Sequence, residues 1–208
     1  EQGAPFTLNG VNSKYGPQYS GDQPGSGTWN TTLVQSVITQ MKGAGGPTQL
    51  NTVRVNLDWG MFQYKTTGGS IAIDTAALTE LDAVIDTARA NGVYVILVPI
   101  HLRQPGSACL AGGKPRLLNA TFNVPAWAWA KLSPPMTPGS DCANSYPAAF
   151  NDKVDDVVAI TEARTYLRTL AARYSDFSTT AAANRSKTVV AIDLVNEMPA
   201  DAANVTAR

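Results

Sequence analysis

Apolar positions along the chain alternate between two periods, and this alternation predicts strands followed by helices. Apolar or β-branched runs bounded by turn residues predict four strands, at residues 6–12, 52–57, 93–100 and 188–195. Apolar residues at helical spacing predict three helices, at residues 33–41, 74–91 and 154–174. A chain that passes from strand to helix to strand usually forms a parallel sheet with right-handed crossovers. The pattern therefore predicts an α/β fold.

Two parallel architectures fit this order of elements. A doubly wound nucleotide-binding sheet needs a glycine-rich turn directly after its first strand, but the glycine cluster at residues 43–46 follows a helix. The chain also contains no G-x-x-x-x-G-K-[ST] phosphate-binding loop. The pattern therefore favours a (β/α) barrel, or part of one.

Polar residues stand where the apolar strand residues stop, which is where (β/α) barrels carry their functional side chains. The second predicted strand, which contains Arg54, is followed by Asp58, the third by His101, and the fourth by Asn196 and Glu197. One such residue alone is more often a cap or a loop residue. Because three strands carry them in the same position, we interpret them as a site.

With these residues, the chain resembles the family 5 glycoside hydrolases, the cellulase-like members of clan A. The resemblance rests on the V-R-V around Arg54, the block at residues 78–97 that leads to His101, and Asn196-Glu197 followed by Pro199. Family members usually have proline directly after the glutamate, whereas Met198 intervenes here. The resemblance implies an eight-stranded (β/α) barrel, of which residues 1–208 would form one incomplete domain with about four βα units, strands one to four.

The resemblance also implies roles for individual residues. Glu197 would be the general acid/base, Asn196 would bind the sugar 2-hydroxyl, and Arg54 and His101 would have electrostatic and substrate-binding roles. A retaining glycosidase needs a second carboxylate about 5 to 5.5 Å from the first, and in this family it follows strand seven. We expect that nucleophile to be missing from this chain.

Strand parity adds one expectation about the barrel interior. Arg54 and Asp193 both fall on inward-facing positions, on the second and the fourth predicted strand, and Asp193 lies too far below Glu197 to act as its catalytic partner. We therefore predict a buried Arg54–Asp193 pair or a shared polar network.

Charge and composition exclude several function classes. The 16 basic and 16 acidic residues among 208 balance, which argues against binding to nucleic acid or to an anionic membrane surface. The longest apolar run, at residues 93–100, is far shorter than the roughly 20 residues of a membrane span. His101 is the single histidine and no C-x-x-C motif occurs, so we expect no metal site and no cofactor.

The segment at residues 102–152 is long for a βα loop and rich in proline, and such loops are usually functional. Trp127 and Trp129 within it, together with Trp59, are candidates for stacking on sugar rings; local packing of the loop is the alternative for Trp127 and Trp129. A disulfide between Cys109 and Cys142 would stabilise the fold by about 3 to 4 kcal/mol.

Localisation signals favour a secreted protein. Only 15% of the residues are charged, below the usual value of about 25%. Candidate glycosylation sequons begin at Asn30, Asn119, Asn184 and Asn204.

Three functional hypotheses follow. In the first, the chain is the N-terminal half of a secreted retaining glycoside hydrolase that cleaves a β-linked polysaccharide or glycoconjugate, completed by further residues or by another chain. In the second, it is a non-catalytic carbohydrate-binding or structural subunit of an extracellular assembly. In the third, two half-barrels pair symmetrically, and catalysis of the family type is compromised.

Overall fold

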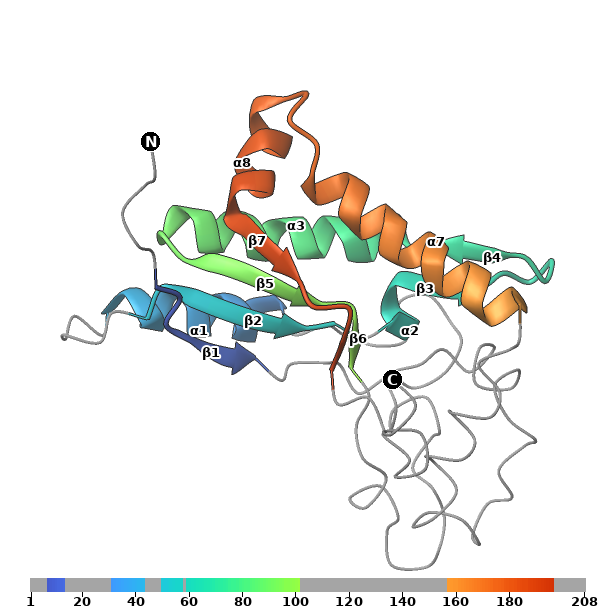
Figure 1. Cartoon of the computed structure of the whole chain (residues 1–208), viewed down its shortest axis with the longest axis horizontal. Helices are drawn as coiled ribbons and strands as arrows, with labels where there is room; N and C mark the ends of the chain where they lie inside the picture. The colour runs from blue at the N-terminus through green and yellow to red at the C-terminus, as the bar shows by residue number, and fades with distance from the viewer. Residues whose placement is uncertain (1–6, 14–30, 44–49, 58, 102–156, 197–208) are drawn as a thin grey trace, which may run out of the picture.

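Four parallel strands form the centre of the molecule (Figure 1). The structure is a computed structural model that describes residues 7–13, 31–43, 50–57, 59–101 and 157–196. The strands are β1 (Gly10–Ser13), β2 (Thr52–Asn56), β5 (Tyr94–Val98) and β7 (Val189–Ile192). Their order in the sheet is β1-β2-β5-β7, and every neighbouring pair is parallel. This confirms the α/β fold with parallel strands.

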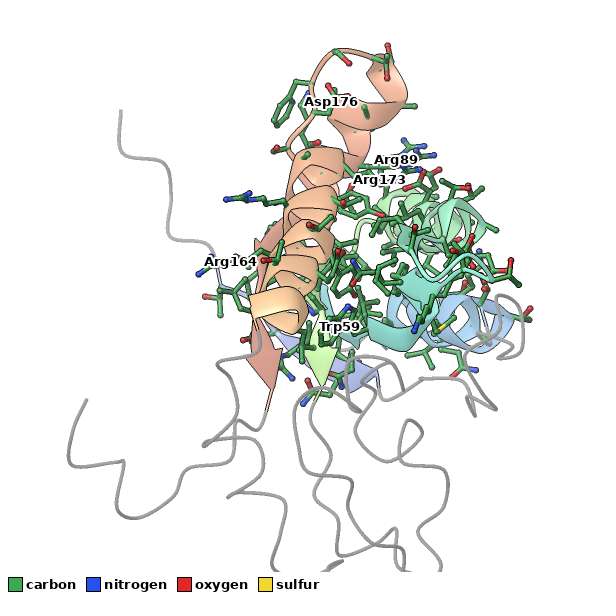
Figure 2. The ribbon with its side chains drawn as sticks, turned by 90° about the vertical axis from the view of Figure 1, so that its right-hand side faces the viewer. Trp59, Arg89, Arg164, Arg173 and Asp176 are labelled. Carbon is green, nitrogen blue, oxygen red and sulfur yellow. The ribbon has the colours of Figure 1, made fainter. Side chains whose placement is uncertain are left out.

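Helices connect the strands and pack on one side of the sheet (Figures 1 and 2). They are α1 (Thr31–Gly43), α3 (Thr75–Ala90), α7 (Val157–Tyr174) and α8 (Thr180–Thr188). Helix α3 begins where the sequence predicts, because the Asp74 carboxylate accepts hydrogen bonds from the backbone N–H groups of Ala76 and Ala77 at 2.9 and 3.2 Å. It ends before Gly92, whose φ of 69° lies in the left-handed region that glycine tolerates.

The two faces of the sheet differ in character. Val53 and Val55 of β2 are fully buried and belong to the hydrophobic core under the helices. Arg54 lies between them in the strand and therefore on the opposite face, where it is partly exposed. The same alternation holds in β5, where Val95 and Leu97 are buried and Ile96 is partly exposed. In a (β/α) barrel the face away from the helices is the interior, so Arg54 points inward as expected.

A short insertion between β2 and α3 was not predicted. It consists of α2 (Trp59–Phe62) and an antiparallel hairpin of β3 (Gln63–Lys65) and β4 (Ile71–Ile73). The hairpin turn contains Gly69 with a φ of 87°. All four residues of α2 are buried, so the insertion extends the core.

Two predicted strands are each interrupted near their carboxyl ends. The strand predicted at residues 93–100 is divided into β5 and β6 (Ile100–His101), and the one predicted at 188–195 is divided into β7 and β8 (Val195–Asn196). Pro99 separates β5 from β6, and proline has no N–H to donate to a strand ladder. Strands β6 and β8 pair in parallel and form a small sheet of their own.

Among the helices of the described residues, none is long and apolar enough to cross a membrane.

Candidate active site

The pairing of β6 with β8 brings two predicted site residues together. His101 and Asn196 are register partners at the carboxyl ends of these strands, and Ile100 and Val195 are partners one residue earlier. Neighbouring strands lie about 4.8 Å apart, so the two residues are adjacent across the sheet. Glu197 follows Asn196 directly in the sequence and itself lies outside the described residues.

Arg54 and Asp193 form the predicted pair. The Arg54 Nε donates to Asp193 Oδ2 at 3.2 Å, and Nη2 donates to the same oxygen. The side chains are 23% and 43% exposed, so the pair is partly buried. The reason is their position: they lie on the inward face of the sheet, away from the helices that cover the core.

Two asparagines complete the environment of Arg54. Its Nη1 donates to the side-chain oxygens of Asn12 on β1 and Asn56 on β2, each at 3.4 Å. Asn12 is the register partner of Arg54, and Asn56 lies two residues further along the same strand. We call Asn12, Arg54, Asn56 and Asp193 the inner polar cluster.

Sequence reasoning missed Asn12 and Asn56, although a signal was present. Asn56 has the same strand parity as Arg54, and side chains two residues apart share one face of a sheet. Asn12 could have been found only once the register of β1 against β2 was known.

The inner polar cluster holds a fixed positive charge among oxygen acceptors on the inward face. The planar guanidinium of Arg54 can bind several oxygens in a defined geometry. Such a group orients carboxylates and hydroxyls without taking part in proton transfer. The arrangement fits an electrostatic role for Arg54 near the strand ends.

Trp59 is not placed as the sequence suggested. It was expected to offer a face to a sugar ring, but it is only 3% exposed. Its indole N–H donates to Gln63 Oε1 at 2.6 Å, and its ring stacks on Tyr166 with centroids 6.4 Å apart and planes at 7°. Figure 2 shows Trp59 beside the N-terminal end of α7. As the first residue of α2, Trp59 lies in the hydrophobic core, where it packs as a structural aromatic.

Several predicted residues lie outside the described part of the chain. These are Glu197, Trp127, Trp129, Cys109, Cys142, Asn30, Asn119 and Asn204. Asn184 is described, and it lies inside helix α8. Its sequon neighbour Arg185 binds Asp82 and Asp86, and Ser186 donates to the carbonyl of Asp176 at 2.7 Å. This folded sequon differs from the surface loop that glycosylation usually uses.

No group of three or more histidine, cysteine, aspartate or glutamate side chains gathers within the described ranges in a way that could hold a metal ion.

Comparison with known proteins identifies the family. The family model described as cellulase (glycosyl hydrolase family 5) matches residues 1–207. The fold is similar to the crystal structure of the endo-1,4-beta-mannanase from Rhizomucor miehei, with a TM-score of 0.55 at 15% sequence identity. The match covers 97% of this chain and 49% of the mannanase, so the chain spans about half the length of that protein. No curated protein matches. Because the family model covers nearly the whole sequence, the chain belongs to glycosyl hydrolase family 5.

Proposed function

We propose that the chain supplies the general acid/base of a secreted retaining glycoside hydrolase that cleaves β-linked polysaccharides or glycoconjugates. The observation that carries this proposal is the parallel pairing of β6 with β8, which sets His101 beside Asn196 one residue before Glu197. Polar residues at the carboxyl ends of adjacent strands are where (β/α) barrels bind and transform substrates.

In the proposed mechanism, Glu197 acts twice. It first gives its proton to the glycosidic oxygen while a second carboxylate attacks the anomeric carbon, so the bond to the leaving group breaks as the glycosyl-enzyme bond forms. Glu197 then takes a proton from water, which attacks the anomeric carbon and releases the second carboxylate. Glu197 must be protonated at the start, and a neighbouring carboxylate would raise its pKa for that purpose.

The second carboxylate is proposed to come from residues outside this sequence, either further along the same chain or on another chain. The half-length match to the mannanase supports this, because the rest of that fold has no counterpart here. The mass of the denatured natural protein tells the two sources apart.

The other residues receive binding roles in the proposal. Asn196 would bind the sugar 2-hydroxyl, while His101 and Arg54 would contribute hydrogen bonds and positive charge at the strand ends. Trp127 and Trp129 are proposed to stack on sugar rings. The low fraction of charged residues supports secretion, and with it a Cys109–Cys142 disulfide and glycosylation at Asn30, Asn119 or Asn204.

The test is hydrolysis by the full-length protein and its Glu197→Gln variant on a panel of β-linked glucans and mannans. Mannan is included because the structural neighbour is described as an endo-1,4-beta-mannanase. We expect the wild type to release sugar and Glu197→Gln to lose about 100- to 10,000-fold in kcat. Glu80→Gln is the matched control, because Glu80 is an exposed residue of α3 and its variant should retain full activity. Undiminished activity of Glu197→Gln contradicts the proposal.

A second candidate is a non-catalytic carbohydrate-binding or structural subunit that uses the glycosidase scaffold. Such a subunit would bind glycan and not turn it over, because retaining hydrolysis needs a second carboxylate. Glycan binding by the wild type with no sugar release on any substrate of the panel would support this candidate.

A further inference from the structure

The break between β5 and β6 is held by a side chain from a helix. Val98, the last residue of β5, and Ile100, the first of β6, flank Pro99. The Pro99 carbonyl accepts a hydrogen bond from the Tyr166 hydroxyl of α7 at 3.1 Å, in a buried environment. A buried carbonyl that has left the strand ladder needs such a partner, because an unsatisfied one is costly.

The Tyr166 ring is itself held rigidly. It is fully buried and stacks on Trp59 and on Phe62, with the Phe62 centroid 5.7 Å away. Trp59 is fixed in turn by Gln63, whose Nε2 donates to the backbone and side-chain oxygens of Glu162 on α7 at 3.1 and 3.0 Å. These contacts between α2 and α7 therefore fix the position of the Tyr166 hydroxyl that binds the Pro99 carbonyl.

The chain on either side of Pro99 leads to the candidate active site. Before it, the Val98 carbonyl accepts from the backbone N–H of Leu57 at 2.8 Å, which ties the bend to the end of β2. After it, β6 pairs with β8 and sets His101 opposite Asn196, the residue before Glu197. The direction in which β6 leaves the main sheet thus determines where both strand ends lie.

We propose that Tyr166 is a positioning residue of the active site. Its hydroxyl fixes the Pro99 carbonyl, which sets the course of β6 and, through the β6–β8 pairing, the place of Asn196, the residue before Glu197. The proposal rests on the proposed function, because it assumes that this pair of strand ends carries the chemistry. Misplacing a catalytic group by about 1 Å can cost about 100-fold in rate, so one remote hydrogen bond can affect turnover.

The same helix offers a matched control. Tyr174 lies two turns beyond Tyr166 on α7, is also buried, and donates its hydroxyl to Asp82 on α3 at 3.1 Å, between helices. Tyr166→Phe and Tyr174→Phe each remove one buried hydroxyl and keep the ring. Both should destabilise the protein, but only the first changes a contact to the strands of the site.

The experiment compares the two variants in the full-length protein by steady-state kinetics well below the unfolding temperature. We expect Tyr166→Phe to lower kcat by about 10- to 100-fold with little change in KM. Tyr174→Phe should keep both values. If the two variants lose kcat equally, or if neither does, the proposal is overturned.

Backbone hydrogen exchange provides a second measurement that needs no activity. Tyr166→Phe should speed exchange selectively at Ile100, His101, Val195 and Asn196, whereas Tyr174→Phe should leave these four amides unchanged. If the wild type hydrolyses no glycan, the proposed function fails while exchange still tests the role of Tyr166. Unchanged exchange in Tyr166→Phe contradicts that role even in an active enzyme.

Discussion

Two clusters of arginine and aspartate lie on opposite sides of the sheet and have different surroundings. The inner polar cluster joins residues of separate strands on the inward face, and its ion pair is partly open to solvent. The second cluster lies between helices α3, α7 and α8, and we call it the helix clamp. Its members are Asp82, Asp86, Arg173, Tyr174 and Arg185.

The helix clamp centres on one buried carboxylate. Asp82, whose side chain is 7% exposed, accepts from Arg173 Nε and Nη2 at 2.9 and 2.6 Å. It also accepts from Arg185 Nη1 at 2.7 Å and from the Tyr174 hydroxyl at 3.1 Å. Arg185 continues to Asp86, with distances of 3.1 and 2.7 Å. Figure 2 shows Arg173 on the side of α7 that faces α3.

The difference shows how the same residue types serve two purposes. A buried carboxylate must be fully hydrogen-bonded, and in the helix clamp Asp82 accepts its hydrogen bonds from residues of two other helices. These bonds hold the three helices together. The inner polar cluster keeps its charges partly exposed, which weakens the ion pair and leaves it accessible on the inward face. We therefore expect the helix clamp to support stability and the inner polar cluster to support function.

The largest predicted effect is on the helix clamp. Asp82→Asn removes the charge that two guanidinium groups share, and we expect the free energy of unfolding to fall by about 3 to 5 kcal/mol in urea denaturation. Asp86→Asn is the control, because its side chain is 39% exposed and the loss should stay below about 1 kcal/mol. Equal losses in the two variants would remove the distinction between a buried and an exposed carboxylate. In both variants kcat should be retained below the unfolding transition.

Tyr174 of the helix clamp should make the free energy of unfolding depend on pH in the alkaline range. Burial, followed by the Asp82 charge, raises the pKa of Tyr174 well above its usual value. Above about pH 10 the unfolded chain loses this proton while the folded protein keeps it. The free energy of unfolding should therefore fall with pH by about 1.4 kcal/mol per unit from this group, and stability below pH 10 is unaffected. Urea midpoints of wild type and Tyr174→Phe between pH 9 and 11 test this; parallel curves contradict it.

The smallest predicted effect is on the inner polar cluster. In a double-mutant cycle of Arg54→Met and Asp193→Asn, we expect a coupling of about 1 kcal/mol in the free energy of unfolding, because solvent screens the pair. A coupling as large as the loss in Asp82→Asn would show that the inner polar cluster is also a stability element.

The sequence predicts the parts of the fold that depend on apolar periodicity and on strand parity. Buried strands β2 and β5 appear as β-branched and apolar runs, and the start of α3 follows from the Asp74 cap. Parity alone predicts that Arg54 and Asp193 meet, although they are 139 residues apart in sequence. The degree of exposure of that pair depends on what covers the inward face, which parity does not describe.

Elements held by tertiary contacts are those that the sequence does not predict. Helix α8 has no apolar stripe, since only Thr188 in it is buried. It depends on the Thr179 cap, whose hydroxyl accepts from the Ala182 N–H at 3.1 Å, and on the bonds of Arg185 to α3. The burial of Trp59 likewise depends on Tyr166, which lies more than a hundred residues further along the chain. Sequence spacing carries no information on either contact.

The most direct test of the central claim is the leaving-group dependence of Glu197→Gln. The dinitrophenolate released from a dinitrophenyl glycoside departs without a proton, whereas a sugar leaving group needs one. The value of kcat/KM reports the step in which the leaving group departs. We expect the variant to lose about 100- to 10,000-fold in kcat/KM on the natural linkage and less than about 10-fold on the dinitrophenyl glycoside. An equal loss on both substrates would contradict the assignment of Glu197 as the general acid.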